Sequence, residues 1–256
     1  MKSCRLALLC LASMTAACAT QAPASQSSTT QTPTPAYKMA LSAPARGEPT
    51  LAQVRTATER FRNVNVALAE GYIRDPFDLC DSAEMMGKPA YLGAMGIHYF
   101  RPDLVGVSAP PNPRVDGNGV HTDFLKPAIL IYEPQKDGSL ELVAVENLVF
   151  LKAWEASGAK DRPSFHGVPW DKMADDPETA IDEAHMFEPH YDRHVWLYRD
   201  NPNGVFTPFN PAVSCQYHTG AKKHVMPQTA AAEIEPFDLA STMPVMRSPA
   251  SHGHGH

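Results

Sequence analysis

The stretch from Pro127 to Phe150 constrains the fold most strongly, because it predicts two β-strands joined by a tight turn. The runs "PAILIYEP" and "LELVAVENLVF" are rich in the β-branched and apolar residues that strands favour. Between them stands "QKDGS", whose Asp137-Gly138 pair favours the positive backbone angles of a two-residue hairpin turn. The sequence therefore predicts an antiparallel sheet that contains this hairpin.

The hairpin also predicts which side chains share a face of the sheet. With the Asp-Gly pair as the whole loop, Glu133 pairs with Leu142, and Ile129 pairs with Glu146. Glu133 and Glu146 then point to the same face but lie roughly 13 Å apart along it, at the usual rise per strand residue. One metal ion therefore cannot be held by both carboxylates.

An amphipathic helix is predicted at the start of the folded region, over residues 51–70. Thr50 and Gln53 form a Thr-x-x-Gln capping box, and apolar residues recur after it at helical spacing. The runs "GIHYF" (96–100) and "HVWLY" (194–198) have the β-branched and aromatic content of two further strands. The predicted sheet therefore draws on segments from both halves of the chain.

The segment between the hairpin and the last strand is predicted to be mostly loop, with a short helix at Pro177–Ala184. Together these elements predict an α+β fold. It consists of one antiparallel β-sheet packed by the N-terminal amphipathic helix, in a single domain.

Composition and charge divide the chain into four segments. Of its 256 residues 43% are hydrophobic, which is enough for one substantial core. We predict a signal peptide at residues 1–18, a disordered tether at 19–47, a globular domain at 48–218 and a flexible tail at 219–256 that ends in "SHGHGH". The net charge of -6, with Lys and Arg scattered, provides no basic face, so nucleic acid is not an expected partner.

The N-terminus has the pattern of an export signal. Lys2 and Arg5 precede an apolar run over residues 6–14, and small residues surround Cys18. The apolar run is far shorter than the ~20 residues that a membrane-spanning helix needs. The sequence therefore predicts export to the cell envelope, in the periplasm or as an outer-membrane lipoprotein.

The residues around Cys18 favour lipidation but leave an alternative open. Ala16 and Ala17 directly before Cys18 resemble the cleavage box of bacterial lipoproteins, in which this cysteine becomes the lipidated mature N-terminus and the membrane becomes a partner. Thr15 departs from that box, which usually has a branched aliphatic residue there. Ordinary cleavage after Ala19 is the alternative.

Two cysteines are left for the folded domain. Cys4 and Cys10 lie in the signal and Cys18 is removed or lipidated, so Cys80 and Cys215 remain. An even pair in an oxidising compartment favours a disulfide, and two buried free thiols are the alternative.

The stretch "HMFEPHYDRHVW" from His185 to Trp196 raises the question of a metal site. His190 and His194 have the spacing that a helix would bring onto one face for a single ion. The following "VWLY" favours a strand, however, where the same spacing separates the two Cα atoms by roughly 13 Å. The other ligands to His194 must then come from neighbouring strands.

The expected partners of His194 are His98 and Glu146, since each is a polar residue within an apolar strand, where burial without a partner is costly. Two imidazoles and a carboxylate are a typical set of protein ligands for Zn, and also suit Fe or Cu. His190 is the expected fourth ligand, provided that Pro189 bends the chain back toward the site. Glu133 and Asp192 are candidates for outer, supporting positions.

Two alternatives to a metal are a buried His and Glu network that only braces the sheet, and a small-molecule pocket without metal. No Gly-x-Ser-x-Gly motif is present and no free cysteine remains, so acyl-transfer chemistry has little support. The sequence leaves open whether the protein is an enzyme.

Several motifs resemble those of a group of exported bacterial proteins known only as hypothetical proteins. The matching runs include "GAMGIHYF", "LVAVENLVF", "HVWLYRDNPNGVF" and "FNPAVSC", and the likeness covers most of residues 51–215. The resemblance supports the limits of a single domain. It implies no activity, cofactor or site.

Overall fold

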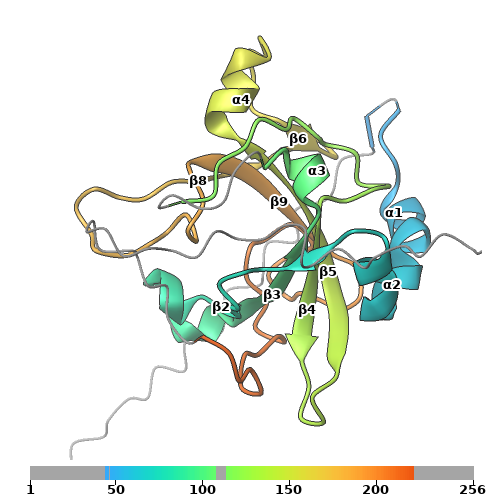
Figure 1. Cartoon of the computed structure of the whole chain (residues 1–256). Helices are drawn as coiled ribbons and strands as arrows, with labels where there is room; N and C mark the ends of the chain where they lie inside the picture. The colour runs from blue at the N-terminus through green and yellow to red at the C-terminus, as the bar shows by residue number, and fades with distance from the viewer. Residues whose placement is uncertain (1–43, 46, 108–113, 222–256) are drawn as a thin grey trace, which may run out of the picture. The chain divides into compact units, whose positions relative to one another are not determined.

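The computed structural model describes residues 44, 45, 47–107 and 114–221, which belong to one compact unit with an α+β fold (Figure 1). The predicted signal peptide with Cys18, the tether up to residue 43 and the tail from residue 222 lie outside the described residues. Within the described part, no helix has the length and apolar character needed to cross a membrane.

An antiparallel sheet of seven strands forms the centre of the described residues. Its path runs β1-β3-β4-β5-β9-β8, and β2 pairs with the same edge of β3 as β1 does. The strands of this sheet are β1 (Ile73–Arg74), β2 (Asp81–Ser82), β3 (Ala94–Phe100), β4 (Ile129–Pro134), β5 (Leu140–Phe150), β8 (Asp171–Met173) and β9 (His190–Trp196). A separate two-stranded sheet is made by β6 (Ser164–Phe165) and β7 (Val168–Pro169).

The β4–β5 hairpin is present, but its loop is longer than predicted. The N–H of Gln135 donates to the carbonyl of Ser139, so the loop has three residues, with Gly138 in the left-handed conformation at φ 84°. Glu133 consequently pairs with Glu141 and not with Leu142. The prediction for that pair was wrong.

A β-bulge restores the predicted register further along the hairpin. The pairing shifts between Ile131 and Tyr132, which leaves Val143 as an extra residue in β5. Beyond the bulge Ile129 pairs with Glu146, as predicted from the turn.

The predicted N-terminal helix begins as expected but is interrupted. The capping box of Thr50 and Gln53 is formed. Asn63 is extended, with φ -94° and ψ 106°, and its side chain accepts a hydrogen bond from the N–H of Asn65, so a new helix starts there. The segment consists of α1 (Leu51–Thr58), the 3₁₀ turn η1 (Glu59–Arg62) and α2 (Val64–Ala69).

The remaining helices are short, and the predicted helix at Pro177–Ala184 is not formed. Asp176 accepts a hydrogen bond from the N–H of Glu178, a local side-chain turn that competes with helix formation. The segment that was predicted to be mostly loop also contains β6, β7 and β8. The other helical elements are η2 (Glu84–Met86), η3 (Ala90–Leu92), α3 (Pro102–Val105) and α4 (Leu151–Ala156).

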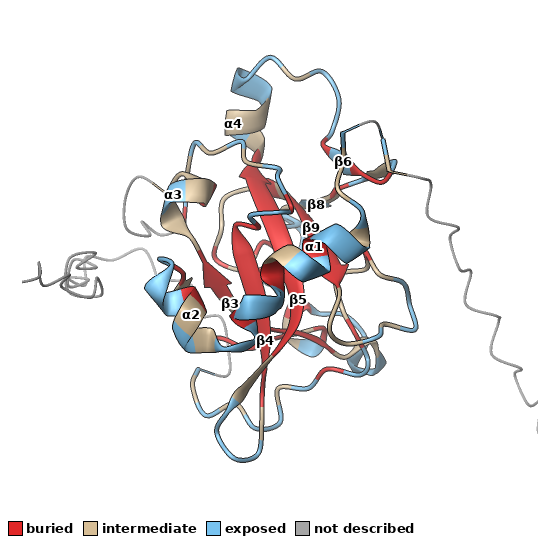
Figure 2. Ribbon diagram, turned by 90° about the vertical axis from the view of Figure 1, so that its right-hand side faces the viewer, coloured by how far each residue is buried: buried red, intermediate tan, exposed pale blue. Residues whose placement is uncertain are grey.

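The two faces of the sheet contribute to two hydrophobic clusters. Leu130 and Val145 belong to a cluster that also contains Phe61 from the N-terminal helical segment. Their neighbours Ile129 and Ala144 point the other way, into the second cluster. Figure 2 shows α1 in front of the buried central strands. The polar residues of the candidate site lie on the second face, where they interrupt an apolar surface.

Candidate metal centre

Three strands bring His98, Glu146 and His194 together. Glu146 of β5 pairs directly with His194 of β9. Glu146 also pairs on its other side with Ile129 of β4, which stands next to Phe100 of β3. His98 lies two residues before Phe100, so the alternation of side chains along β3 points it to the same face. The predicted convergence of these three residues is therefore present.

The ligand atoms of these three residues form a close group. His98 Nε2 lies 3.3 Å from Glu146 Oε2, and His194 Nε2 lies 3.4 Å from the same oxygen. One ligand atom from each of the three residues lies within 4.8 Å of the other two. All three side chains are removed from solvent, since the exposed fractions are 14% for His98, 4% for Glu146 and 1% for His194.

Several buried polar atoms of the group lack a hydrogen-bond partner among the described residues. They are Oε2 of Glu146 and both ring nitrogens of His194. The contacts of Glu146 with the imidazoles are longer than the ~2.7–2.9 Å of a charge-assisted hydrogen bond. The group is thus compact but unsatisfied, although each buried polar atom without a partner costs about 1–3 kcal/mol.

The protonation states differ within the group. Burial lowers the pKa of His194 to about 4, so its imidazole is neutral at neutral pH. Burial also opposes a charge on His98, but the carboxylates of Asp81 and Glu146 together raise the pKa of His98 well above its ordinary value. Burial by itself would raise the pKa of Glu146, but the neighbouring His194 and His98 outweigh this effect, and the pKa is lowered to about 2. The carboxylate is therefore ionised in the form that binds metals.

Two further polar side chains at the site were not predicted. Asp81 of β2 places its Oδ2 2.9 Å from His98 Nδ1, on the side of the ring away from Glu146, and 3.8 Å from His185 Nδ1. His185 has a left-handed backbone with φ 55°, as has Met186 after it with φ 67°. Such strain in residues other than glycine occurs often at functional sites. The sequence offered one hint to Asp81, since it directly follows the predicted disulfide cysteine Cys80.

His190 and Asp192 line the same cavity but lie outside the close group. His190 is the first residue of β9, and its Nδ1 lies 2.9 Å from the backbone oxygen of Glu188. Burial lowers the pKa of His190 to about 4 and raises the pKa of Asp192 well above its ordinary value. His190 is thus neutral at neutral pH, and burial favours the protonated form of Asp192 at the edge of the group.

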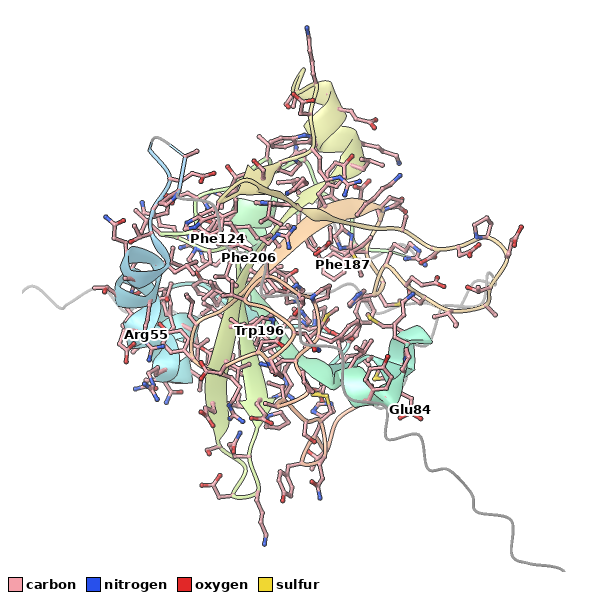
Figure 3. All side chains as sticks on the ribbon, turned by 180° about the vertical axis from the view of Figure 1, so that it is seen from behind. Arg55, Glu84, Phe124, Phe187, Trp196 and Phe206 are labelled. Atoms are coloured by element: carbon pink, nitrogen blue, oxygen red, sulfur yellow. A yellow bond between two sulfur atoms is a disulfide. The ribbon has the colours of Figure 1, made fainter. Side chains whose placement is uncertain are left out.

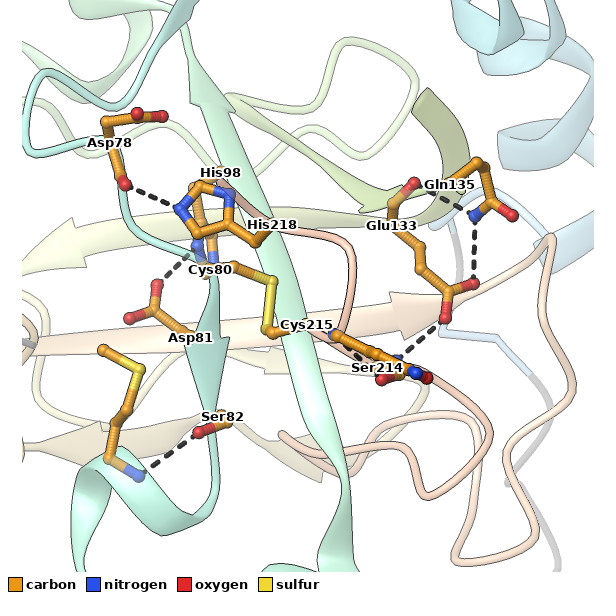
Figure 4. The surroundings of a disulfide bond; sticks show 12 residues. Asp78, Cys80, Asp81, Ser82, His98, Glu133, Gln135, Ser214, Cys215 and His218 are labelled. Carbon is orange, nitrogen blue, oxygen red and sulfur yellow. Dashed lines mark hydrogen bonds and ion pairs between the residues drawn. A yellow bond between two sulfur atoms is a disulfide. The ribbon is translucent and has the colours of Figure 1, made fainter. Parts of the chain in front are cut away.

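Glu133 lies elsewhere and is not among the residues that line this cavity. One of its carboxylate oxygens accepts a hydrogen bond from the N–H of Ser214 at 2.8 Å, and the other lies 2.7 Å from Arg199. Figure 4 shows Glu133 beside Ser214, separated from the Asp81–His98 pair by the disulfide. Glu133 therefore anchors the C-terminal segment to β4.

The predicted disulfide between Cys80 and Cys215 is confirmed (Figure 4). Cys80 is buried and directly precedes Asp81, so the bond fixes the start of β2 against the segment after β9. The covalent link thus lies one residue from the carboxylate that contacts His98.

The cavity at the group is small and partly apolar. Its volume is about 30 Å³, more than the ~10–15 Å³ that a single buried water needs. Phe187 lines it, and the ring of Trp196 stacks on His194 at a centroid distance of 6.2 Å. Phe187 and Trp196 are labelled in Figure 3. The cavity has room for one ion or for one or two water molecules.

Comparisons of the chain with protein-family models, with curated proteins and with solved structures find no match. A function for this chain is therefore inferred from the chemistry of its site.

Proposed function

We propose that this protein is exported, anchored in the cell envelope through a lipidated Cys18, and binds one transition-metal ion through His98, Glu146 and His194. The spacing of the three ligand atoms carries the metal proposal. The sequence of the N-terminus and the disulfide, a bond typical of oxidising compartments, support export.

The two distances from Glu146 to the imidazoles fit tetrahedral coordination. Zinc binds imidazole nitrogen and carboxylate oxygen at ~2.0–2.2 Å, and two ligands at a tetrahedral angle are then ~3.3–3.5 Å apart. The two contacts of Glu146 Oε2, at 3.3 Å to His98 and 3.4 Å to His194, match that separation. A direct hydrogen bond would be shorter. An ion among the three atoms therefore accounts for both distances.

The unsatisfied atoms favour an ion over a bracing network. A buried network stabilises a fold when each of its members has a hydrogen-bond partner. Both ring nitrogens of His194 and Oε2 of Glu146 lack one among the described residues. His194 and Glu146 already have the forms that a metal ion requires, a neutral imidazole and an ionised carboxylate. A bracing role would leave the cost of burying these atoms without compensation.

The size of the cavity disfavours a pocket for an organic ligand. Its 30 Å³ lies far below the ~300 Å³ at which pockets for small organic molecules begin. Three protein ligands leave a fourth position on a tetrahedral ion. We assign that position to water, because His190 lines the cavity but lies outside the close group. Zn is the proposed ion, and Fe and Cu are alternatives with the same ligand types.

The test is elemental analysis of the purified full chain, with the tail histidines His252, His254 and His256 replaced by Ala so that they bind no metal. The expected result is about one equivalent of a transition metal. His98→Ala and His194→Ala should each reduce the metal content severalfold or more. The matched control is His121→Ala, because His121 is half-buried, is not among the residues that line the cavity, and contacts backbone oxygens in its own loop.

Two results would contradict the metal proposal. Metal content near zero in the parent chain, after zinc, iron and copper have each been offered, would favour the bracing network. Metal content that survives both His98→Ala and His194→Ala would locate the binding elsewhere in the chain. Loss of folding is checked separately by circular dichroism of every variant.

A further inference from the structure

Asp81 contacts one residue of the candidate metal centre, His98, on the side of its ring that faces away from Glu146. Its Oδ2 lies 2.9 Å from Nδ1 of His98, while Nε2 of the same ring lies 3.3 Å from Glu146. The two ring nitrogens of His98 therefore have different partners. One faces Asp81 and the other faces the group that would hold the ion.

We propose that Asp81 is a positioning residue, which holds His98 so that Nε2 binds the ion and Nδ1 keeps its proton. This inference rests on the proposed metal function. A histidine that binds a metal usually donates its second N–H to a carboxylate or a backbone oxygen, which fixes the ring and makes the nitrogen at the metal more basic. Asp81 is the carboxylate in that place.

The backbone around Asp81 is held from two directions, so its carboxylate has a defined position. Asp81 pairs with Gly96 of β3, two residues before His98 on the same strand. On its other side Cys80 is bonded to Cys215 (Figure 4). The Asp81 side chain is only 4% exposed, and water does not compete strongly for the contact. A buried carboxylate fixed in this way can orient an imidazole.

Ion binding under this proposal moves one proton. The Nε2 lone pair of His98 is needed for the ion, so any proton on Nε2 leaves to solvent when the ion binds. The Nδ1 proton stays in the contact with Asp81. No redox step or further reactant is involved.

The test compares three variants of the full chain, each carrying the tail histidine replacements. Asp81→Ala removes the carboxylate, and Asp81→Asn keeps an oxygen that can accept from Nδ1. The matched control is Asp75→Asn, since Asp75 is a buried carboxylate that lines the same cavity but accepts a hydrogen bond from the N–H of Phe77. Zinc affinity is measured by competition with a chelator, and the nitrogen signals of His98 are recorded by ¹H–¹⁵N NMR with and without zinc.

Asp81→Ala is expected to weaken zinc binding about 10- to 100-fold, the usual effect of removing an outer partner of a ligand histidine. Asp81→Asn should recover part of this loss, and Asp75→Asn should have the smallest effect. In the zinc-loaded parent chain Nδ1 of His98 should carry a proton and Nε2 should be shifted by the ion. In the metal-free chain the Nδ1 signal should change on Asp81→Ala.

Three results would overturn the role of Asp81. The first is an unchanged zinc affinity in Asp81→Ala, and the second is coordination of zinc through Nδ1 of His98. The third is an equal loss of zinc affinity in Asp75→Asn, because the loss would then come from removing a negative charge near the ion and not from the contact with His98. If the parent chain binds no zinc, the proposed metal function fails. The metal-free NMR comparison still tests the contact between Asp81 and His98 by itself, and an unchanged Nδ1 signal refutes it. If Asp81→Ala does not fold, the zinc affinity and the Nδ1 signal of Asp81→Asn are compared with those of the parent chain instead.

Discussion

Reduction of the Cys80–Cys215 bond should lower the free energy of unfolding by several kcal/mol. The two cysteines are 135 residues apart in the sequence, so the bond closes a loop that includes most of the described domain. The chain-entropy relation for a loop of this length gives about 5 kcal/mol at 25 °C, and measured values are typically about 2–4 kcal/mol. Since small domains have a total stability of about 5–15 kcal/mol, the loss is a large part of the whole.

The effect should arise in the unfolded chain, because other contacts hold the C-terminal segment in the folded protein. Ala94 and Asn210 form a β-bridge, and Leu79 forms another with Ala221. The N–H of Ser214 also donates to the carboxylate of Glu133. The reduced protein should therefore keep its native structure, and hydrogen exchange in residues 210–221 should stay slow under conditions where the domain is folded.

The measurement is urea unfolding with and without a phosphine reductant, followed by tryptophan fluorescence. Trp170 and Trp196 are buried, so their emission reports on loss of the core. A chelator is present throughout, because bound metal would add its own stabilisation. Mass spectrometry of alkylated thiols checks that the bond is reduced. Unfolding energies that agree within about 0.5 kcal/mol in the two states would refute the reasoning from chain entropy.

Three further predictions concern other parts of the molecule. Burial raises the pKa of Asp75 to about 6 from an ordinary 3.8, so the folded chain retains a proton there that the unfolded chain has lost. Stability from this group is therefore present below about pH 4 and is lost as pH rises to about 6, by about 3 kcal/mol in total. Urea unfolding with chelator should show this loss in the parent chain relative to Asp75→Asn, and parallel pH profiles would contradict it. Gly93→Ala should cost at least about 2 kcal/mol of unfolding free energy, because φ is 84° and a Cβ would overlap the backbone of Asn210. Gly138→Ala has the same φ in open space and should cost less, and equal losses would contradict the steric argument. Cys18→Ala should release the chain from membranes, and an unmodified mature N-terminus in the parent chain, seen by mass spectrometry, would contradict lipidation.

The hairpin shows how a partly wrong local prediction still placed Glu146 correctly. The loop has one residue more than the Asp-Gly rule implies, which shifts Glu133 opposite Glu141. The bulge at Val143 then shifts the pairing back by one residue, so that Ile129 faces Glu146 as expected. Turn propensity alone cannot predict both changes, because the bulge depends on packing over both faces of the sheet.

The helix prediction failed for a similar reason. The apolar spacing over residues 51–70 continues across Asn63, and local propensity therefore favours one helix. Asn63 instead adopts an extended conformation and caps a second helix with its side chain. Asn at such a point is compatible with both arrangements, so local propensity does not decide between them. Helix periodicity identified the apolar face but not the break.

The residues of the candidate site were predictable to the extent that they are polar groups next to apolar residues in strands. Each of His98, Glu146 and His194 adjoins at least one buried apolar side chain, and the high cost of burying such groups marks them as a set. The spacing of His190 and His194 in the sequence was a weaker guide, because a strand carries those two side chains far apart along one face.

Asp81 could not be found in the same way, and the reason is physical. It lies in a strand of two residues, which has no periodic pattern to detect. Its position depends on two long-range constraints, the pairing with Gly96 and the bond from Cys80 to Cys215. A residue that orients a ligand need not interrupt an apolar run, since it can come from any segment that the tertiary structure brings behind the ring. Ligands in regular strands are therefore accessible to sequence reasoning, whereas the groups that orient them become visible only once the strand order and the disulfide are known.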